Sequence, residues 1–284
     1  MIVKYLGTGA AEGIPAVFCH CDVCQYARNH KGRNIRTRAQ ALIDGKLLLD
    51  FGPDTYMHSL QYDINLADIE VCFITHAHDD HLYLEDLRAR RRSRANINPG
   101  TPALKVYGGA GVKNVLKPKE DGFITKDNSV RFVEICAFEQ VEVLDGYFVT
   151  AIPAVHNTDS PFVYIITKDN HSFLYAHDTD YFEESVWDYF REKGLYFNAI
   201  SLDCTEGIKH IDYPGHMNFE RMQTMCQRLV KERCIDERTT VIANHISHNG
   251  LANYEKATEV GKLIGCMVSF DGLEVVGLAG LDGA

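Results

Sequence analysis

Short apolar runs, each bounded by Gly, Asp, Asn or Pro, recur along the whole chain. Runs of this kind between turn residues are typical of β-strands in a globular core. They predict strands at residues 1–6, 39–43, 46–50, 71–75, 104–107, 130–136, 147–152, 162–167, 172–176, 198–203, 239–243 and 267–270. Asp44-Gly45 separates two of these runs and predicts a tight hairpin.

Helical spacing of apolar residues appears between some of these strands. It predicts helices at residues 82–94, 109–116, 182–193, 218–233 and 254–264, with Asn218 as an N-cap. A single parallel sheet would alternate strand and helix more strictly, whereas here the strands come in clusters. We therefore predict an α/β (α+β) fold in one domain over residues 1–284, with two mixed β-sheets and helices outside them.

The composition is that of an ordinary globular protein, with 45% hydrophobic and 24% charged residues among 284. The net charge of −10 argues against a nucleic-acid partner. The first residues enter a strand pattern without the features of a signal peptide, and no apolar stretch is long enough to cross a membrane. We expect a cytoplasmic protein without a membrane partner, and a homodimer stays open as its assembly state.

Polar residues that can bind metals follow directly after several apolar runs. His76 follows 71–75, His156 follows 151–155, Asp178 lies just past 172–176, and His245 lies just past 239–243. Strand ends are where α/β sheets place their functional side chains, so we expect these residues at one edge of the fold. His177 precedes Asp178 and would point the opposite way if the strand continued, which excludes it as a ligand.

The loop at residues 75–81 carries the strongest chemical signal. It places His76, His78, His81 and two aspartates, Asp79 and Asp80, within seven residues. Imidazole and carboxylate groups suit Zn²⁺, Mn²⁺ or Fe. Four ligands are too many for one hydrolytic metal, so the loop predicts two neighbouring metals. A shared carboxylate such as Asp178 would hold them about 3.5–4 Å apart.

A second cluster, Cys19, Cys21 and Cys24, places three thiols within six residues. Such thiols can converge on one tetrahedral Zn²⁺ that needs a fourth ligand. The candidates are His20, whose neighbours on both sides are already ligands, and His248, which we favour. Of the nine cysteines, five others lie in apolar or helical stretches and are predicted to be reduced and mostly buried; they are Cys72, Cys136, Cys204, Cys226 and Cys266.

The segment His76-Ala77-His78-Asp79-Asp80-His81 resembles the signature of the metallo-β-lactamase superfamily. Leu6-Gly7-Thr8-Gly9 and Leu49-Asp50-Phe51-Gly52 resemble other landmarks of that family. The resemblance implies a four-layer αβ/βα sandwich. It also implies one metal held by His76, His78 and His156 and another held by Asp80, His81 and His245, with Asp178 bridging.

The cysteine cluster and the segment His245-Ile246-Ser247-His248 resemble the PhnP group of that superfamily. The resemblance implies a structural zinc held by Cys19, Cys21, Cys24 and His248. It implies Asp80 and His216 as catalytic residues, with His216 acting as general acid or orienting group near the leaving group. The alternative interpretation of His216 is a surface histidine at a helix start.

The function expected from these residues is hydrolysis of a small phosphate ester, cyclic or open, by a metal-bridged hydroxide. One alternative is a tRNA 3′-processing endonuclease of the ribonuclease Z type. Others are a non-hydrolytic role resembling the PqqB group and attack on a carbonyl, as in a thioester or a β-lactam. A binding or structural protein would have no use for seven converging ligands.

Weaker signals have no assigned function. The basic run at residues 88–94 predicts a solvated helix face, with a phosphate clamp led by Arg88 as the alternative. Isolated His58, His171 and His210 are expected on the surface. Phe18, Tyr56 and Tyr213 flank the motifs, where pocket walls and core packing explain them equally well.

Overall fold

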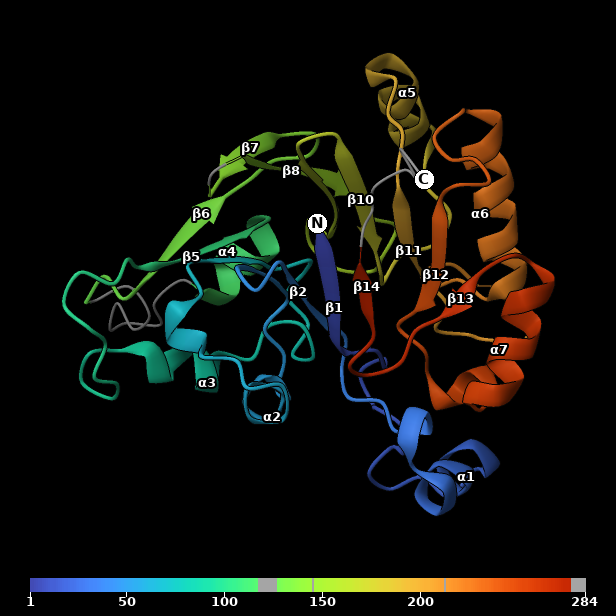
Figure 1. The fold of residues 1–284 in the computed structure, drawn as a ribbon, viewed down its shortest axis with the longest axis horizontal. Coiled ribbons are helices and arrows are strands. Elements are labelled where there is room, and N and C mark those ends of the chain that lie inside the picture. The colour runs from blue at the N-terminus through green and yellow to red at the C-terminus, as the bar shows by residue number, and fades with distance from the viewer. Residues whose placement is uncertain (117–126, 145, 212, 277–284) are drawn as a thin grey trace, which may run out of the picture.

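The computed structural model describes residues 1–116, 127–144, 146–211 and 213–276. Two β-sheets pack face to face, and helices cover their outer faces (Figure 1). A buried cluster that includes Tyr5, Phe73, Tyr164 and Phe173 fills the space between the sheets. The predicted αβ/βα sandwich with two mixed sheets is therefore confirmed.

The first sheet has the strand order β14-β1-β2-β3-β4-β5-β6. Its strands in chain order are β1 (Ile2–Gly7), β2 (Gln40–Ile43), β3 (Leu47–Leu49), β4 (Val71–Phe73), β5 (Leu104–Gly108), β6 (Val130–Glu134) and β14 (Glu274–Val276). The pairs from β14 to β3 are antiparallel, and those from β3 to β6 are parallel. The parallel strands β3 and β4 consequently end at the same edge.

The second sheet has the order β13-β12-β11-β10-β9-β8-β7 and repeats this division. Its strands are β7 (Gln140–Val143), β8 (Tyr147–Pro153), β9 (Phe162–Lys168), β10 (His171–Ala176), β11 (Ala199–Asp203), β12 (Thr240–Asn244) and β13 (Met267–Val268). Pairs from β7 to β10 are antiparallel and those from β10 to β13 are parallel. The ends of β10, β11 and β12 therefore also meet at one edge.

Helices cover both outer faces, and α1 (Asp22–His30) lies beyond the lower ends of the strands in Figure 1. The other helices are α2 (Thr55–Gln61), α3 (Leu84–Leu87), α4 (Ala110–Leu116), α5 (Glu184–Lys193), α6 (Phe219–Lys231) and α7 (Tyr254–Leu263). Leu87 of α3 and Val112 of α4 pack on the first sheet, whereas Trp187 of α5 and Met222 of α6 pack on the second. The Asn218 side chain accepts a hydrogen bond from the Arg221 backbone N–H, which confirms the predicted N-cap, a contact that contributes about 1 kcal/mol.

The helix predicted at residues 82–94 is wrong in its length. Only α3 and a 3₁₀ turn at Arg88–Arg90 form, and turns follow. Arginines four apart repel one another on a helix, as Arg88 would repel Arg92. The Arg90 guanidinium donates instead to backbone carbonyls of Leu66, Ala67, Pro102 and Ser129, which ties this segment to neighbouring loops.

Other differences are smaller. The strand predicted at 267–270 ends at Val268, and α1, α2, β7 and β14 were not predicted. His58 was expected on the surface but is buried, where its ring contacts Thr37 Oγ1 at 2.7 Å and Gln40 Oε1 at 2.6 Å. Burial lowers the pKa of His58 to about 4. His210 is exposed as expected, and His171 is half-buried.

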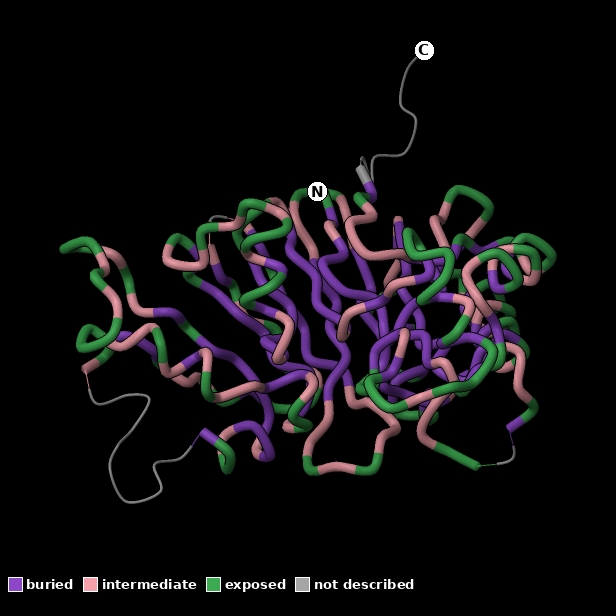
Figure 2. The backbone as a smooth tube through the Cα atoms, turned by 90° about the horizontal axis from the view of Figure 1, so that it is seen from below, coloured by how far each residue is buried: buried purple, intermediate pink, exposed green. Residues whose placement is uncertain are grey.

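Buried segments run through the two sheets, and exposed segments lie on the loops and outer helices (Figure 2). The predicted burial of the five scattered cysteines holds for Cys72, Cys204 and Cys266, whereas Cys226 is half-buried and Cys136 is exposed. Among the residues that the structure describes, no helix is long and apolar enough to cross a membrane.

Candidate metal centre and active site

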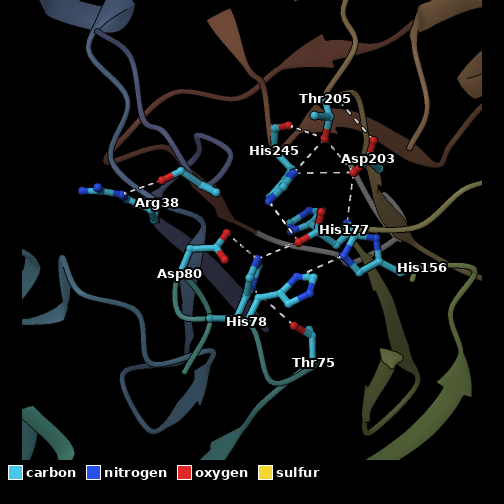
Figure 3. A network of polar contacts seen from close by, with 12 residues as sticks. Arg38, Thr75, His78, Asp80, His156, His177, Asp203, Thr205 and His245 are labelled. Atoms are coloured by element: carbon cyan, nitrogen blue, oxygen red, sulfur yellow. Dashed lines mark hydrogen bonds and ion pairs between the residues drawn. The ribbon is translucent and has the colours of Figure 1, made fainter. Parts of the chain in front are cut away.

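The predicted active-site ligands meet at the edge where the parallel strands of both sheets end, and Figure 3 shows His78, Asp80, His156 and His245 among them. The loop with His76, His78, Asp80 and His81 follows β4 of the first sheet. His156, Asp178 and His245 follow β8, β10 and β12 of the second sheet. Seven side chains from two sheets thus converge into two adjoining groups, as the strand-end pattern predicts.

The first group contains His76, His78 and His156, whose ligand atoms lie within 4.8 Å of one another. His78 Nδ1 is 2.9 Å from His76 Nε2 and 3.3 Å from His156 Nε2. Burial lowers the pKa of both His76 and His156, so these rings favour the neutral form that binds a metal.

The second group contains Asp80, His81, Asp178 and His245. Asp178 Oδ2 lies 2.8 Å from His81 Nε2, 3.4 Å from His245 Nε2 and 3.5 Å from His76 Nε2. Because Asp178 approaches rings of both groups, its carboxylate occupies the position expected for a bridging ligand. Burial would raise the pKa of Asp178, but the charges of His245 and His81 hold it well below its usual value.

The hydrogen bonding of two histidine nitrogens in the second group indicates whether its side chains suit a metal ion. His81 Nε2 and His245 Nε2 are buried and make no hydrogen bond among the described residues, and both face the carboxylate of Asp178, at 2.8 and 3.4 Å. The other nitrogen of each ring is held, with His81 Nδ1 2.8 Å from Asp50 Oδ2 and His245 Nδ1 2.8 Å from Thr205 Oγ1. Rings oriented in this way leave Nε2 to face a cation, so the site fits a divalent metal.

The sequence indicates Asp50 only as a family landmark, but in the structure its carboxylate contacts a candidate metal ligand, His81. It is fully buried, and its Oδ1 accepts hydrogen bonds from Thr75 N at 2.8 Å and Thr75 Oγ1 at 2.9 Å. Its backbone has φ of 65°, in the left-handed region. The available signal was a carboxylate placed directly after the entirely apolar strand β3.

Asp203 has a corresponding place at the end of β11. Its carboxylate accepts the backbone N–H groups of Asp178, Thr205 and Met217 at 3.0, 3.1 and 2.9 Å. Burial would raise its pKa, but His216 and His245 hold that pKa well below the usual value. Asp203 therefore anchors the backbone of a predicted bridging ligand, a role that the sequence pattern did not reveal.

His216 lies in the turn before α6, beside the metal groups. Its Nδ1 is 3.3 Å from Asp178 Oδ1 and 3.5 Å from Asp203 Oδ2. Burial would lower its pKa, but the hydrogen bond and charge of Asp203 raise it to about 9. A raised pKa favours the protonated ring, which could then donate a proton.

The four predicted zinc ligands also lie together. Cys19, Cys21, Cys24 and His248 have ligand atoms within 4.8 Å of one another. His248 Nδ1 is 3.5 Å from both Cys19 Sγ and Cys21 Sγ. Hydrogen bonding from the Cys21 backbone N–H lowers the pKa of Cys19, which favours a thiolate. His20 is not part of this group.

A cavity of about 220 Å³ opens over the two groups of candidate metal ligands. His78, Asp80, His156 and His216 line it, together with residues of the loops after β1, β11 and β12. Phe18, Tyr56 and Tyr213 are exposed rather than packed in the core and do not line the cavity.

The structure also places His177, which was excluded as a ligand, and Arg88, for which a phosphate clamp was the alternative to a solvated helix face. His177 is buried, with Nε2 2.7 Å from Ser201 Oγ, and lies outside the ligand groups. Arg88 pairs with Glu85 and does not line the cavity. These observations favour a solvated or structural role for the basic run at residues 88–94 over a role as a phosphate clamp.

Comparison with known proteins agrees with this geometry. Residues 46–236 match the family described as "Beta-lactamase superfamily domain". A ribonuclease Z from Enterococcus faecalis is 30% identical over 161 residues, which cover 51% of this chain and only 45% of that protein. Thus the chain aligns with less than half of this relative's length.

Two solved structures are similar over nearly the whole chain. A diphosphatase from the PhnP family has a TM-score of 0.73 and 22% identity, with 96% of each chain covered. Zn²⁺-bound PqqB from Methylobacterium extorquens also has a TM-score of 0.73, at 17% identity, with 97% of this chain and 99% of that chain covered. At these identities the likeness concerns the fold.

Proposed function

The chain belongs to the beta-lactamase superfamily, and from this premise we propose that it is a metal-dependent hydrolase of a small phosphodiester. The observation that carries the proposal is the carboxylate of Asp178, which lies between two ligand groups and beside the ring of His216. Metal ligands next to a proton donor are the parts that displacement at phosphorus requires.

We assign His76, His78 and His156 to one cation and Asp80, His81 and His245 to the other, with Asp178 between them. When bound, a pair of Zn²⁺, Mn²⁺ or Fe ions supplies Lewis acidity toward phosphoryl oxygens and a nucleophilic hydroxide at neutral pH. Asp50 and Thr205 hold the rings of His81 and His245 so that their Nε2 atoms face the site.

His216 is the proposed general acid. A leaving alkoxide needs a proton, and the imidazolium of His216, held by Asp203, can deliver it at the mouth of the site. Asp203 then faces a neutral ring and stays ionised because backbone N–H groups stabilise its charge. Asp80 contributes to catalysis as a metal ligand close to His81, at 3.1 Å.

A structural zinc at Cys19, Cys21, Cys24 and His248 completes the proposal. His248 lies three residues after His245, so a zinc there would fix the segment that carries an active-site ligand. All nine cysteines are free, which agrees with zinc thiolates in a reducing cytoplasm.

The second candidate function is that of a ribonuclease Z-type endonuclease, favoured by the sequence similarity over half of the chain. The discriminating experiment measures hydrolysis of bis(p-nitrophenyl) phosphate, ribose cyclic phosphates, a precursor tRNA and a thioester by the metal-loaded protein. We expect turnover of the small phosphodiesters alone. Selective cleavage of the precursor tRNA would establish the second candidate instead, and selective thioester cleavage would reject both.

A further inference from the structure

The loop after β1 places Glu12 over the same cavity as His78, Asp80 and His216. Its carboxylate oxygens lie 3.4 Å from Ser247 Oγ and 3.5 Å from Asn249 Nδ2. Contacts this long are weak, so the carboxylate keeps capacity to accept hydrogen bonds from a ligand. Glu12 is therefore positioned to contact the part of a substrate that extends beyond the metal groups.

The charge of the cavity wall is unusual for an enzyme that binds phosphates. Thirteen described residues line it; Glu12 and Glu206 belong to this lining, and none of the thirteen is Lys or Arg. Glu206 is balanced by Lys209, whose Nζ lies 3.2 Å away. Glu12 forms no ion pair with any residue that the structure describes. Apart from His216 and the candidate metal ligands, the one charged group of this described lining that has no ion pair is therefore the carboxylate of Glu12.

The lining also lacks stacking surfaces. Apart from the histidines, no aromatic ring is among the thirteen residues. A nucleobase or a quaternary ammonium group would find only histidine rings here, without a Phe, Tyr or Trp face among the described lining residues. A hydroxyl group, by contrast, can donate to Glu12 and accept from the amide of Asn249. The small cavity of about 220 Å³ leaves room for only a short arm.

We propose that Glu12 is a specificity-determining residue that rejects substrates with a second phosphate beside the scissile diester. The preferred substrate is then a monoanionic diester with a short, uncharged and hydroxyl-bearing arm. A second phosphate would lie near the exposed carboxylate of Glu12, where repulsion between like charges weakens its binding at low salt. This inference rests on the proposed phosphodiesterase function.

The test uses three p-nitrophenyl phosphodiesters with one common leaving group. Their second arms are ethyl, 2,3-dihydroxypropyl and 2-hydroxy-3-phosphopropyl. For the wild-type protein we expect kcat/KM about tenfold higher for the dihydroxypropyl diester than for the phosphorylated one, and a smaller ratio at high salt. Glu12→Gln should raise kcat/KM for the phosphorylated diester about tenfold, mainly through KM, and leave the ethyl diester within about twofold.

The matched control is Glu192→Gln, which removes a carboxylate that is 76% exposed on α5, and it should keep the wild-type ratio. Calorimetry adds a readout that is independent of turnover. The wild-type protein should bind glycerol 3-phosphate more tightly than glycerol 1,3-bisphosphate, and Glu12→Gln should remove that preference.

Two outcomes separate the two proposals. Turnover of the diesters with the same ratio in Glu12→Gln and wild-type protein would overturn the role of Glu12 alone. Turnover of none of them by metal-loaded wild-type protein would overturn the proposed function, and the inference with it.

Discussion

Replacing Asp50 by Asn tests how the protein orients a metal ligand. Asp50 Oδ1 accepts both hydrogen bonds from Thr75, and Oδ2 faces His81 Nδ1 at 2.8 Å. An asparagine can keep its oxygen toward Thr75, but its NH₂ group must then face the His81 ring. Because NH₂ can only donate, it favours the tautomer of His81 with the proton on Nε2, the atom that should bind the cation.

The expected loss of metal affinity follows from this change in the tautomer of His81. Loss of a partner that orients a metal-bound histidine weakens metal affinity by about 10–100-fold, or about 1.4–2.7 kcal/mol. The side chain is nearly isosteric, and the Thr75 contacts can be kept, so we expect the fold to survive. The second ligand group should lose affinity, whereas His76, His78 and His156 should keep theirs.

The assay is metal titration of the metal-free protein, with bound metal measured by mass spectrometry and folding followed by circular dichroism. Asp188→Asn, at an exposed position of α5, serves as the control. Unchanged affinity for every ion in a folded Asp50→Asn variant would refute the orienting role of Asp50.

Three further predictions concern other parts of the molecule. Cys21→Ser should lose one zinc per chain and lower the melting temperature, and unchanged zinc content would reject the structural site. His216→Ala should slow hydrolysis of alkyl diesters about 10²-fold or more but p-nitrophenyl esters much less; equal losses would contradict an acid role. The pKa of His58 is about 4 when folded, against about 6.5 when unfolded, so only the unfolded state gains a proton between these values. Folding free energy should fall by about 3 kcal/mol as pH drops from 6.5 to 4, and His58→Gln should flatten this slope in urea melts; equal slopes would count against burial of a neutral ring.

The sequence predicted the fold and the converging ligands because both depend on local patterns. Apolar runs mark the strands, and a ligand directly after a run must lie at a sheet edge, as His76 and His245 do. Asp50 and Asp203 were not predicted as site residues because their contacts are with residues far along the chain, such as His81 and Asp178. The burial of His58 was not predicted for the same reason, since its partners Thr37 and Gln40 come from other segments.

The predicted helix at 82–94 failed for a different reason. Spacing of apolar residues suggested a continuous helix, but it did not include the repulsion among clustered arginines or the carbonyl partners of Arg90. Helix length depended here on tertiary contacts, which a single sequence does not display.

The most direct test of the central claim is an anomalous difference map from crystals of the protein as purified, recorded at the absorption edge of each bound metal. We expect two peaks on either side of Asp178, one near His76 and one near His81, and a separate zinc peak among Cys19, Cys21, Cys24 and His248. The metal-dependent function would be contradicted if crystals of a fully active phosphodiesterase preparation showed no peak beside Asp178.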